Sequence, residues 1–409
     1  MAEAPAGRAS TPARTSSTSR GRRTAGTVSD RSEGGSKLLR LRLRSTVTEA
    51  RPTSLELFFD LVFVVVIARM SDLIQTDPAP KVFVEYFGLF AIVFFTWVGF
   101  TTYADRFDVD DTVHRLIVLG AALANIVVAI HVDDAFTSGS EPFALATIAT
   151  RACLLAVTDR SRRKVPEAAA FQGYYEIRWA LGLAVWIVSL FVPTPWRYVV
   201  WGIALAIEIG TPLLSVVRIP TLPLVSSHIA ERFGLFTIIV LGESVVSVAA
   251  GISDVNFAFQ SSAVAVGTFV LAAAVWWLYF DCVTAVHADS TWYVYLHGPL
   301  YAGLGLVAPG ALLAIDGAEG ATLPAGARAA LCGGIAIFLF GVCAIELASR
   351  PPPAARRRAA LRAGTGALAL AIAFLGGVLN PVATILLLVA VVVGELCFEL
   401  SLIRRSSPG

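Results

Sequence analysis

Ionisable side chains inside long apolar segments are the residues of this sequence most able to do chemistry. Asp60 and Glu243 both lie well inside such segments, and Asp60 is about 9 Å along a helix that would start at Ser54. A charge in the hydrocarbon core of a membrane costs about 2.5–3.5 kcal/mol or more, so it is seldom kept without a partner or a role. We therefore identify Glu243 as the strongest candidate for a transport or binding residue, and we expect Asp60 to face a polar interior.

The segment that contains Glu243 is the densest in charge. Arg232 and Glu243 are eleven residues apart, almost a whole number of helical turns, so they share one face at about 16 Å separation. His228 lies one turn before Arg232 on the same face. This pattern predicts a polar stripe that runs from one membrane surface towards the other. Alternatively, Glu231 and Arg232 are interfacial charges that reach the surface and pair locally.

Glu56 has a competing structural explanation. It shares a helix face with Asp60, four residues later, which favours a joint role as transport or binding residues. However, Thr53 and Glu56 also have the spacing of a capping box, in which Glu56 only closes the start of a helix.

Further candidates are ionisable groups in other apolar segments. Arg151 and Arg178 are expected counter-ions for Asp60, Glu231 or Glu208, because pairing is the commoner fate of a buried charge. The sequence does not name the pairs.

His297 is the remaining candidate. Gly298-Pro299 follows it and predicts a place where a helix loosens and frees backbone carbonyls. A lone histidine is more often a satisfied core residue than a proton carrier, so both interpretations stay open.

No known catalytic or cofactor motif accompanies these residues. The sequence lacks a zinc-protease motif, a serine-hydrolase elbow and a phosphate-binding loop, so we predict no catalytic residues, no metal and no cofactor.

The elements that position these residues are predicted to be membrane-spanning helices. The 409 residues are 56% hydrophobic and 15% charged, with a mean hydropathy of +0.71, outside the range of soluble globular proteins. The alternating pattern of a membrane barrel is absent, so we predict an all-α integral membrane protein with about twelve helices. The predicted spans are 54–75, 82–103, 112–131, 142–158, 176–192, 196–215, 228–251, 260–280, 292–315, 326–347, 359–378 and 381–403.

Positive charges predict the orientation. Residues 1–45 are rich in Ser, Thr, Arg, Gly and Pro, and we expect a disordered basic cytoplasmic tail. With this tail inside, the outward segments hold only Lys81, Arg197 and Arg328. The inward segments hold Arg106, Arg115, Arg160, Arg162, Arg163, Lys164, Arg218, Arg350, Arg356, Arg357, Arg358, Arg362, Arg404 and Arg405. This asymmetry predicts a multi-pass protein of the cell membrane with both termini cytoplasmic.

Matching landmarks in the two halves of the chain suggest an internal repeat. Glu56-Leu57-Phe58, Trp97, His114 and Glu208 have counterparts 175 to 187 residues later, in the same order, at Glu231-Arg232-Phe233, Trp277, His297 and Glu395. Six helices in each half, 54–215 and 228–403, would enter the membrane from the same side. We therefore predict two parallel pseudo-repeats of six helices.

Two long motifs resemble a known family. Leu55-Glu56-Leu57-Phe58-Phe59-Asp60-Leu61-Val62-Phe63-Val64 and Glu231-Arg232-Phe233-Gly234-Leu235-Phe236-Thr237-Ile238-Ile239-Val240-Leu241-Gly242-Glu243-Ser244 resemble signature stretches of the bacterial low temperature requirement protein A (LtrA) family. His297-Gly298-Pro299-Leu300 resembles a further element, with Gly298 in place of an apolar residue. The resemblance implies one polytopic membrane domain over residues 46–405. The family name describes a need during growth in the cold, not a mechanism.

Three functions from different classes remain open. The first is a secondary transporter, proton-coupled in one form, of an unknown small solute or lipid. The second is a membrane-embedded enzyme that acts on lipid, and the third is a structural or sensory membrane protein that supports growth in the cold. We expect membrane lipids as partners and no nucleic acid, and the sequence does not predict an oligomeric state.

Overall fold

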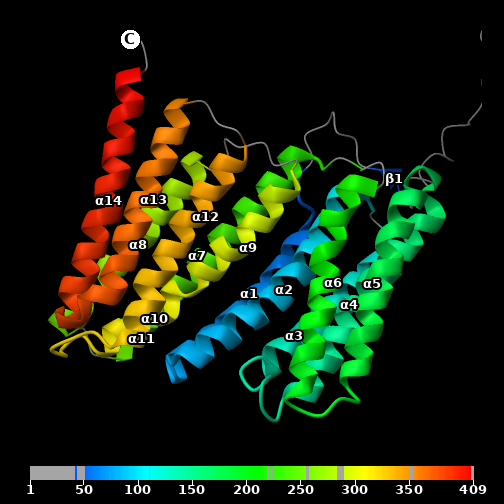
Figure 1. Ribbon diagram of the computed structural model, residues 1–409, viewed down its shortest axis with the longest axis horizontal. Helices are drawn as coiled ribbons and strands as arrows, with labels where there is room; N and C mark the ends of the chain where they lie inside the picture. Colours follow the sequence, from blue (N-terminus) through cyan, green and yellow to red (C-terminus); the bar gives the residue numbers. More distant parts are fainter. Residues whose placement is uncertain are drawn as a thin grey trace, which may run out of the picture. The chain divides into compact units, whose positions relative to one another are not determined.

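A computed structural model of the chain describes residues 42–43, 51–109, 111–218, 222, 224–254, 258–282, 290–349 and 353–406 (Figure 1). Nearly all of these residues lie in helices, which confirms the predicted all-α class. The exception is a two-residue strand, β1 (Arg42–Leu43), that pairs antiparallel with β2 (Phe107–Asp108). The rest of the predicted tail, Arg350, and the side chains of Arg218, Arg404 and Arg405 lie outside the described residues.

Helices occupy all six predicted segments of the first half. Local sequence sets their starts: the predicted capping box of Thr53 and Glu56 opens the first helix, Pro80 occupies a first-turn position of the second, and Asp111 caps the third. The helices are α1 (Ser54–Thr76), α2 (Pro80–Arg106), α3 (Thr112–His131), α4 (Ser140–Lys164), α5 (Ala169–Ser189), which follows the 3₁₀ turn η1 (Pro166–Ala168), and α6 (Trp196–Arg218).

The second half is also helical but more interrupted. Its elements are α7 (Ser226–Asp254), α8 (Phe259–Cys282), α9 (Thr291–Gly305), α10 (Val307–Asp316), α11 (Ala325–Arg328), the π-helical turn η2 (Ala329–Gly333), α12 (Gly334–Ala348), α13 (Pro353–Leu375), the 3₁₀ turn η3 (Gly376–Val378) and α14 (Pro381–Ser406). The prediction that the helix loosens at Gly298-Pro299 is wrong in position. Helix α9 continues through Pro299, and the helix breaks at Leu306.

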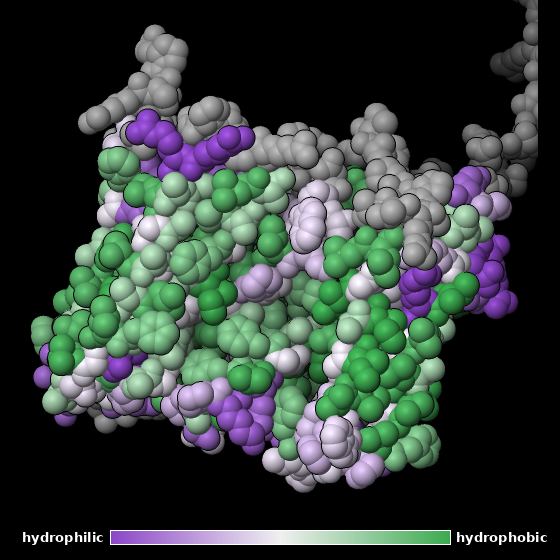
Figure 2. Space-filling view, viewed as in Figure 1, coloured by the Kyte–Doolittle hydropathy of each residue, from purple (hydrophilic) through white to green (hydrophobic). Residues whose placement is uncertain are grey.

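Ten helical stretches of the described residues are long and apolar enough to cross a membrane. Helices α1 and α5 are not among them, and in α1 the four charges Glu56, Asp60, Arg69 and Asp72 interrupt the apolar sequence. In Figure 2, hydrophobic side chains cover the sides of the helices and hydrophilic ones gather near their ends. The chain is therefore an all-α membrane protein with about ten candidate spans, and twelve remains a prediction.

Helices α1 and α2 contact helices from both halves of the chain. Helix α1 packs on α3, α7 and α10, and α2 packs on α4, α7 and α9 (Figure 1). Buried aromatic rings fill this region: Trp97 of α2 lies with its ring centroid 4.3 Å from that of Phe236 and 4.9 Å from that of Phe233 in α7. Charged residues on α1, α2 and α7 are thereby held in a well-packed interior.

Glycines bring α9 and α12 unusually close. A Cβ atom at Gly303 would lie 2.7 Å from the carbonyl oxygen of Gly334, and a Cβ at Gly334 would lie 2.6 Å from the carbonyl oxygen of Gly303. Such reciprocal contact of backbones requires residues without side chains. It fixes α9, which carries His297, against α12.

Candidate functional site

Five charged residues from three helices, four of them buried and Glu56 partly buried, form what we call the central charge network. Glu56 and Asp60 come from α1, Asp105 from α2, and His228 and Arg232 from α7. The two family-like motifs therefore face each other across the α1–α7 contact. The helical spacing of four residues, in both Glu56/Asp60 and His228/Arg232, places each pair on the facing side of its helix.

Arg232 joins the two carboxylates of α1. Its Nη2 pairs with Asp60 Oδ1, and its Nη1 lies 3.3 Å from Glu56 Oε2. Trp97 Nε1–H also donates to Asp60 Oδ1, at 2.7 Å. Asp60 is 0% and Arg232 1% exposed, so Arg232 is not the interfacial, surface-seeking charge of the alternative interpretation. Two carboxylates on one fully buried guanidinium make a strong charge-assisted arrangement.

His228 extends the network to α2. Its Nε2 lies 3.1 Å from Glu56 Oε2, and its Nδ1 lies 3.0 Å from Asp105 Oδ1. The backbone N–H of Val225 donates to Asp105 Oδ2 at 2.8 Å. The Asp105 contact is a hydrogen bond, whereas the Glu56 contact is an ion-pair distance that attracts only a doubly protonated, charged imidazole. The network therefore has three carboxylates, one permanent cation and one ring that changes charge by binding a proton.

Glu243 lies apart from this network, further along α7. It is half-buried, and Ser247 and Asp72 of α1 lie near it. Asp72 is held by Arg69 at 2.6 Å, and Arg69 also pairs with Asp133. The α1 and α7 positions between the two polar groups include the buried Phe63, Val66, Phe236 and Val240. A mainly apolar layer, which also holds the hydrogen-bonded hydroxyls of Thr237 and Tyr301, thus separates the network from Glu243.

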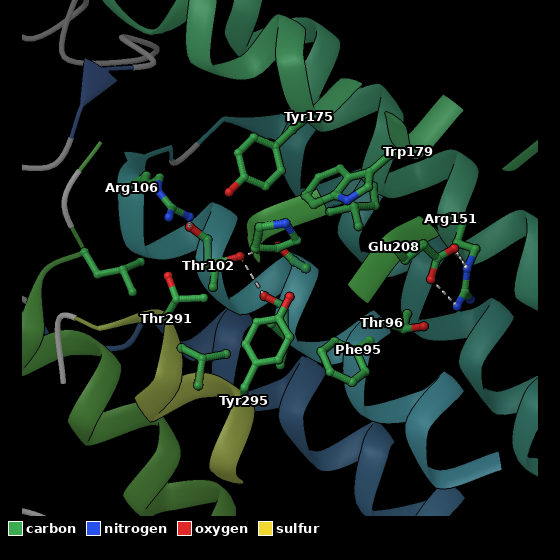
Figure 3. A pocket seen from close by; sticks show the side chains of 16 residues that line it. Phe95, Thr96, Thr102, Arg106, Arg151, Tyr175, Trp179, Glu208, Thr291 and Tyr295 are labelled. Carbon is green, nitrogen blue, oxygen red and sulfur yellow. Dashed lines mark hydrogen bonds and ion pairs between the residues drawn. The ribbon is translucent and has the colours of Figure 1, made fainter. Parts of the chain in front are cut away.

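A cavity lies on the other face of α2, between α2, α4, α5, α6 and α9. The volume open to the centres of water-sized molecules is about 80 Å³, which is enough for several waters or a small solute. Figure 3 shows Arg106 and Tyr175 on one side of it and the Arg151–Glu208 pair on the other. Its lining is Phe95, Thr96, Val98, Gly99, Thr102, Arg106, Arg151, Leu154, Tyr175, Trp179, Glu208, Pro212, Leu224, Thr291, Val294 and Tyr295.

Arg151 and Glu208 form one of the predicted pairs. Arg151 Nε and Nη2 donate to the two Glu208 oxygens at 2.6 and 2.8 Å, and Trp186 Nε1–H adds a third donor at 3.1 Å. Arg178 is no counter-ion to the three proposed carboxylates: it stacks on Tyr174 and donates to its carbonyl oxygen. Glu231 lies on the exposed side of α7.

His297 lies in an aromatic box beside the network. Its Nδ1 is 2.7 Å from the carbonyl oxygen of Tyr293, and the hydroxyl of Tyr279 lies 3.1 Å from Nε2. A neutral ring that donates from Nδ1 and accepts at Nε2 satisfies both contacts, which favours the core interpretation. Gly298 is explained by packing, because a Cβ there would lie 3.0 Å from Phe94 Cε1.

Sequence reasoning missed two features. Asp105 was not predicted, because an aspartate near a helix end looks like an interfacial charge. The second is a cluster in which Arg362 of α13 faces Glu346 of α12 and Glu395 and Glu399 of α14. Arg362 Nη2 lies 2.8 Å from Glu399, whereas Nε is 3.9 Å from Glu395. The spacing of four between the two α14 glutamates is the signal that could have found it.

Comparison with known proteins identifies the family of the chain. Residues 51–395 match the model of the bacterial low temperature requirement A protein family. An uncharacterized protein of Rhizobium meliloti (strain 1021) is 28% identical over 235 residues, which are 55% of this chain and 57% of that relative. The match thus spans little more than half the length of that relative. Since the family model covers most of the chain, including the network, the protein belongs to the bacterial low temperature requirement A (LtrA) family.

Proposed function

We propose that this protein is a proton-coupled secondary transporter of a small solute. In this proposal it lies in the cell membrane with both termini in the cytoplasm, and its twelve helices form two parallel repeats. The contacts of α1 and α2 with both halves support a repeat interface at the network. Transporters of this kind place their sites at such interfaces.

The observation that carries the proposal is that α2 separates a protonatable network from a cavity. Asp105 of α2 belongs to the network and Trp97 of α2 contacts it, while Thr102 and Arg106 line the cavity. Asp105 and Arg106 are adjacent in sequence, so a movement of the last turn of α2 changes both sites. This is the physical basis for coupling one proton to one solute.

The network supplies a proton-dependent switch. When His228 loses a proton, its charge attraction to Glu56 of α1 is lost, while the neutral ring can still donate from Nδ1 to Asp105 of α2. The α1–α2–α7 contact is then weakened at one end. We propose that this favours a rearrangement that opens the cavity, and that Glu243 serves as a second proton site beyond the apolar layer.

Liposomes with an enclosed pH dye test this proposal. Purified protein is exposed to a panel of carboxylates, amines, neutral metabolites and lipids, and the internal pH is followed. A solute-dependent pH change that is lost in Asp60→Asn and Glu243→Gln is expected. Glu231→Gln is the matched control, because it removes an exposed carboxylate from the same helix. A pH change that persists unaltered in both Asp60→Asn and Glu243→Gln would contradict the proposal.

A structural role for the buried charges is the second candidate. The complete hydrogen bonding of Glu208 by Arg151 and Trp186 favours it for that pair. In that case neutral substitutions in the network would lower thermal stability in detergent and leave the liposome pH signal unchanged.

A further inference from the structure

Arg106 is the cationic side chain of the cavity that has no carboxylate partner within ion-pair distance among the described residues. The other lining arginine, Arg151, is neutralised by two hydrogen bonds to Glu208. Arg106 instead donates from Nη1 to the carbonyl oxygen of Thr102 at 2.9 Å and from Nε to that of Leu222 at 3.4 Å. The described lining of the cavity therefore holds one cation that no carboxylate contacts, although the charge of Asp105 acts on it from the preceding position in α2.

The guanidinium of Arg106 is held in place by these contacts. Its central carbon lies 4.9 Å from the ring centroid of Phe171, and the two backbone carbonyls fix its plane. Of its five N–H groups, the two on Nη2 have no acceptor within hydrogen-bonding distance in the described part of the chain. A fixed guanidinium with a spare edge suits a carboxylate or sulfonate oxygen.

The neighbouring carboxylate does not take this place. Asp105 faces the opposite side of α2, where it accepts from the Val225 N–H and contacts His228. Three hydroxyls of the cavity are engaged with the backbone, and those of Tyr175 and Thr291 also line it. Thr96, Thr102 and Tyr295 each donate to a backbone carbonyl, of Ile92, Val98 and Ile209 respectively.

Apolar and aromatic side chains line the rest of the cavity. Trp179, Phe95, Leu154 and Val294 contribute flat or branched surfaces. A cavity with one charged anchor and an apolar wall selects an amphipathic ligand, and its small free space excludes a bulky one.

We infer that this cavity binds a small organic monoanion with an aromatic or branched apolar body. The anionic group lies on Arg106, and the body packs on Trp179 and Phe95. That the bound anion is also the transported solute rests on the proposed function. Transfer of such an anion with one proton moves no net charge, which is the least costly way to cross the membrane.

Calorimetric titration of the full-length protein in detergent tests the inference with three ligands of one shape. Phenylacetate is the anion, phenylacetamide its neutral analogue and phenethylamine its cationic analogue. We expect phenylacetate to bind at least tenfold more tightly than either analogue. We expect Arg106→Gln to remove that preference and Arg106→Lys to retain part of it. Arg178→Gln is the matched control, because Arg178 also stacks on an aromatic ring and donates to a carbonyl but does not line the cavity.

Either of two results would overturn the inference: equal or tighter binding of phenylacetamide or phenethylamine by the wild type, or no binding of phenylacetate at all. Both come from the wild type, so they do not depend on the folding of a variant. The experiments distinguish failure of this inference from failure of the proposed function. Anion binding without any liposome pH signal would leave the site standing and remove coupled transport, whereas a pH signal for amines alone would do the reverse.

Discussion

Arg232 holds two carboxylates of α1 on one guanidinium, and no other described residue within ion-pair distance of Asp60 carries a positive charge. Removing one partner of a buried ion pair leaves an uncompensated charge, which costs more than the pair contributed. The same reasoning applies to Arg362, which faces three glutamates. The structure thus distinguishes buried charges whose removal leaves a carboxylate without its cation from charges whose removal does not.

Arg232→Gln is expected to destabilise the folded protein by about 3–5 kcal/mol, because Asp60 and Glu56 lose their cation. The double variant Asp60→Asn/Arg232→Gln should recover part of this loss, since it also removes a buried negative charge. Thermal unfolding in detergent measures both. Equal stability of Arg232→Gln and the wild type would contradict the ion-pair account.

Glu395→Gln should be tolerated, whereas Arg362→Gln should not. The nearest distance from Glu395 to a charged Arg362 nitrogen is 3.9 Å, and the hydroxyl of Thr365 is another polar group near its carboxylate. Arg362, by contrast, is shared with Glu346 and Glu399. Unfolding temperatures of the two variants should therefore differ clearly, and a larger loss in Glu395→Gln would reverse the assignment.

At the scale of the element, backbone contact and helix capping decide how the helices meet. Gly303 and Gly334 let α9 and α12 touch through their main chains. The two arginines predicted to face outward are tied to helix ends: Arg197 donates to the carbonyls of Ser189 and Val192, and Arg328 to that of Ala373. Such contacts satisfy carbonyls that a helix end leaves without partners.

Gly334→Ala and Gly333→Ala form a matched pair on neighbouring residues. A Cβ at Gly334 would lie 2.6 Å from the Gly303 carbonyl oxygen, while a Cβ at Gly333 has no atom within 4 Å. Gly334→Ala should destabilise the protein by about 1–3 kcal/mol through overpacking. Gly333→Ala should be neutral or stabilise by up to about 1 kcal/mol. Similar unfolding temperatures for the two variants would contradict the close α9–α12 contact.

The pH dependence of the stability of Asp111→Asn tests the ion pair that links α3 and α4. Burial alone would raise the pKa of Asp111, but its hydrogen bond from Arg160, the His114 N–H and the charge of Arg160 together lower that pKa below 3.8. Because the pKa is lower in the folded state, the ionised carboxylate stabilises the fold at pH values above the pKa of the unfolded state. This stabilisation is lost as the pH falls through the pKa of the folded state. Asn keeps the helix cap but not the ion pair. The variant should therefore unfold earlier than wild type at pH 7, and the difference should shrink below about pH 3.8. A gap unchanged by acid would argue against the ion pair.

At the scale of the whole molecule, apolar length along the chain made the helices predictable. All twelve predicted segments contain helix, and α3 has the predicted bounds. Ion-pair partners could not be predicted from the sequence in the same way, because they depend on which helices are neighbours. Arg151–Glu208 was one of several alternatives, Asp60 pairs with a residue 172 positions away, and Asp105 was missed. The cavity lies between α2, α4, α5, α6 and α9, and no local sequence pattern predicts that these helices meet.

Uphill uptake of a permanent anion tests most directly whether the network couples protons to the cavity. Liposomes receive a pH gradient and equal concentrations of labelled phenylmethanesulfonate on both sides, since this anion does not cross lipid as a neutral acid. We predict accumulation in wild type and Glu231→Gln, and at least a tenfold slower accumulation in His228→Gln, whose side-chain amide cannot bind a proton. Equal accumulation in His228→Gln, or none in wild type, would contradict the account.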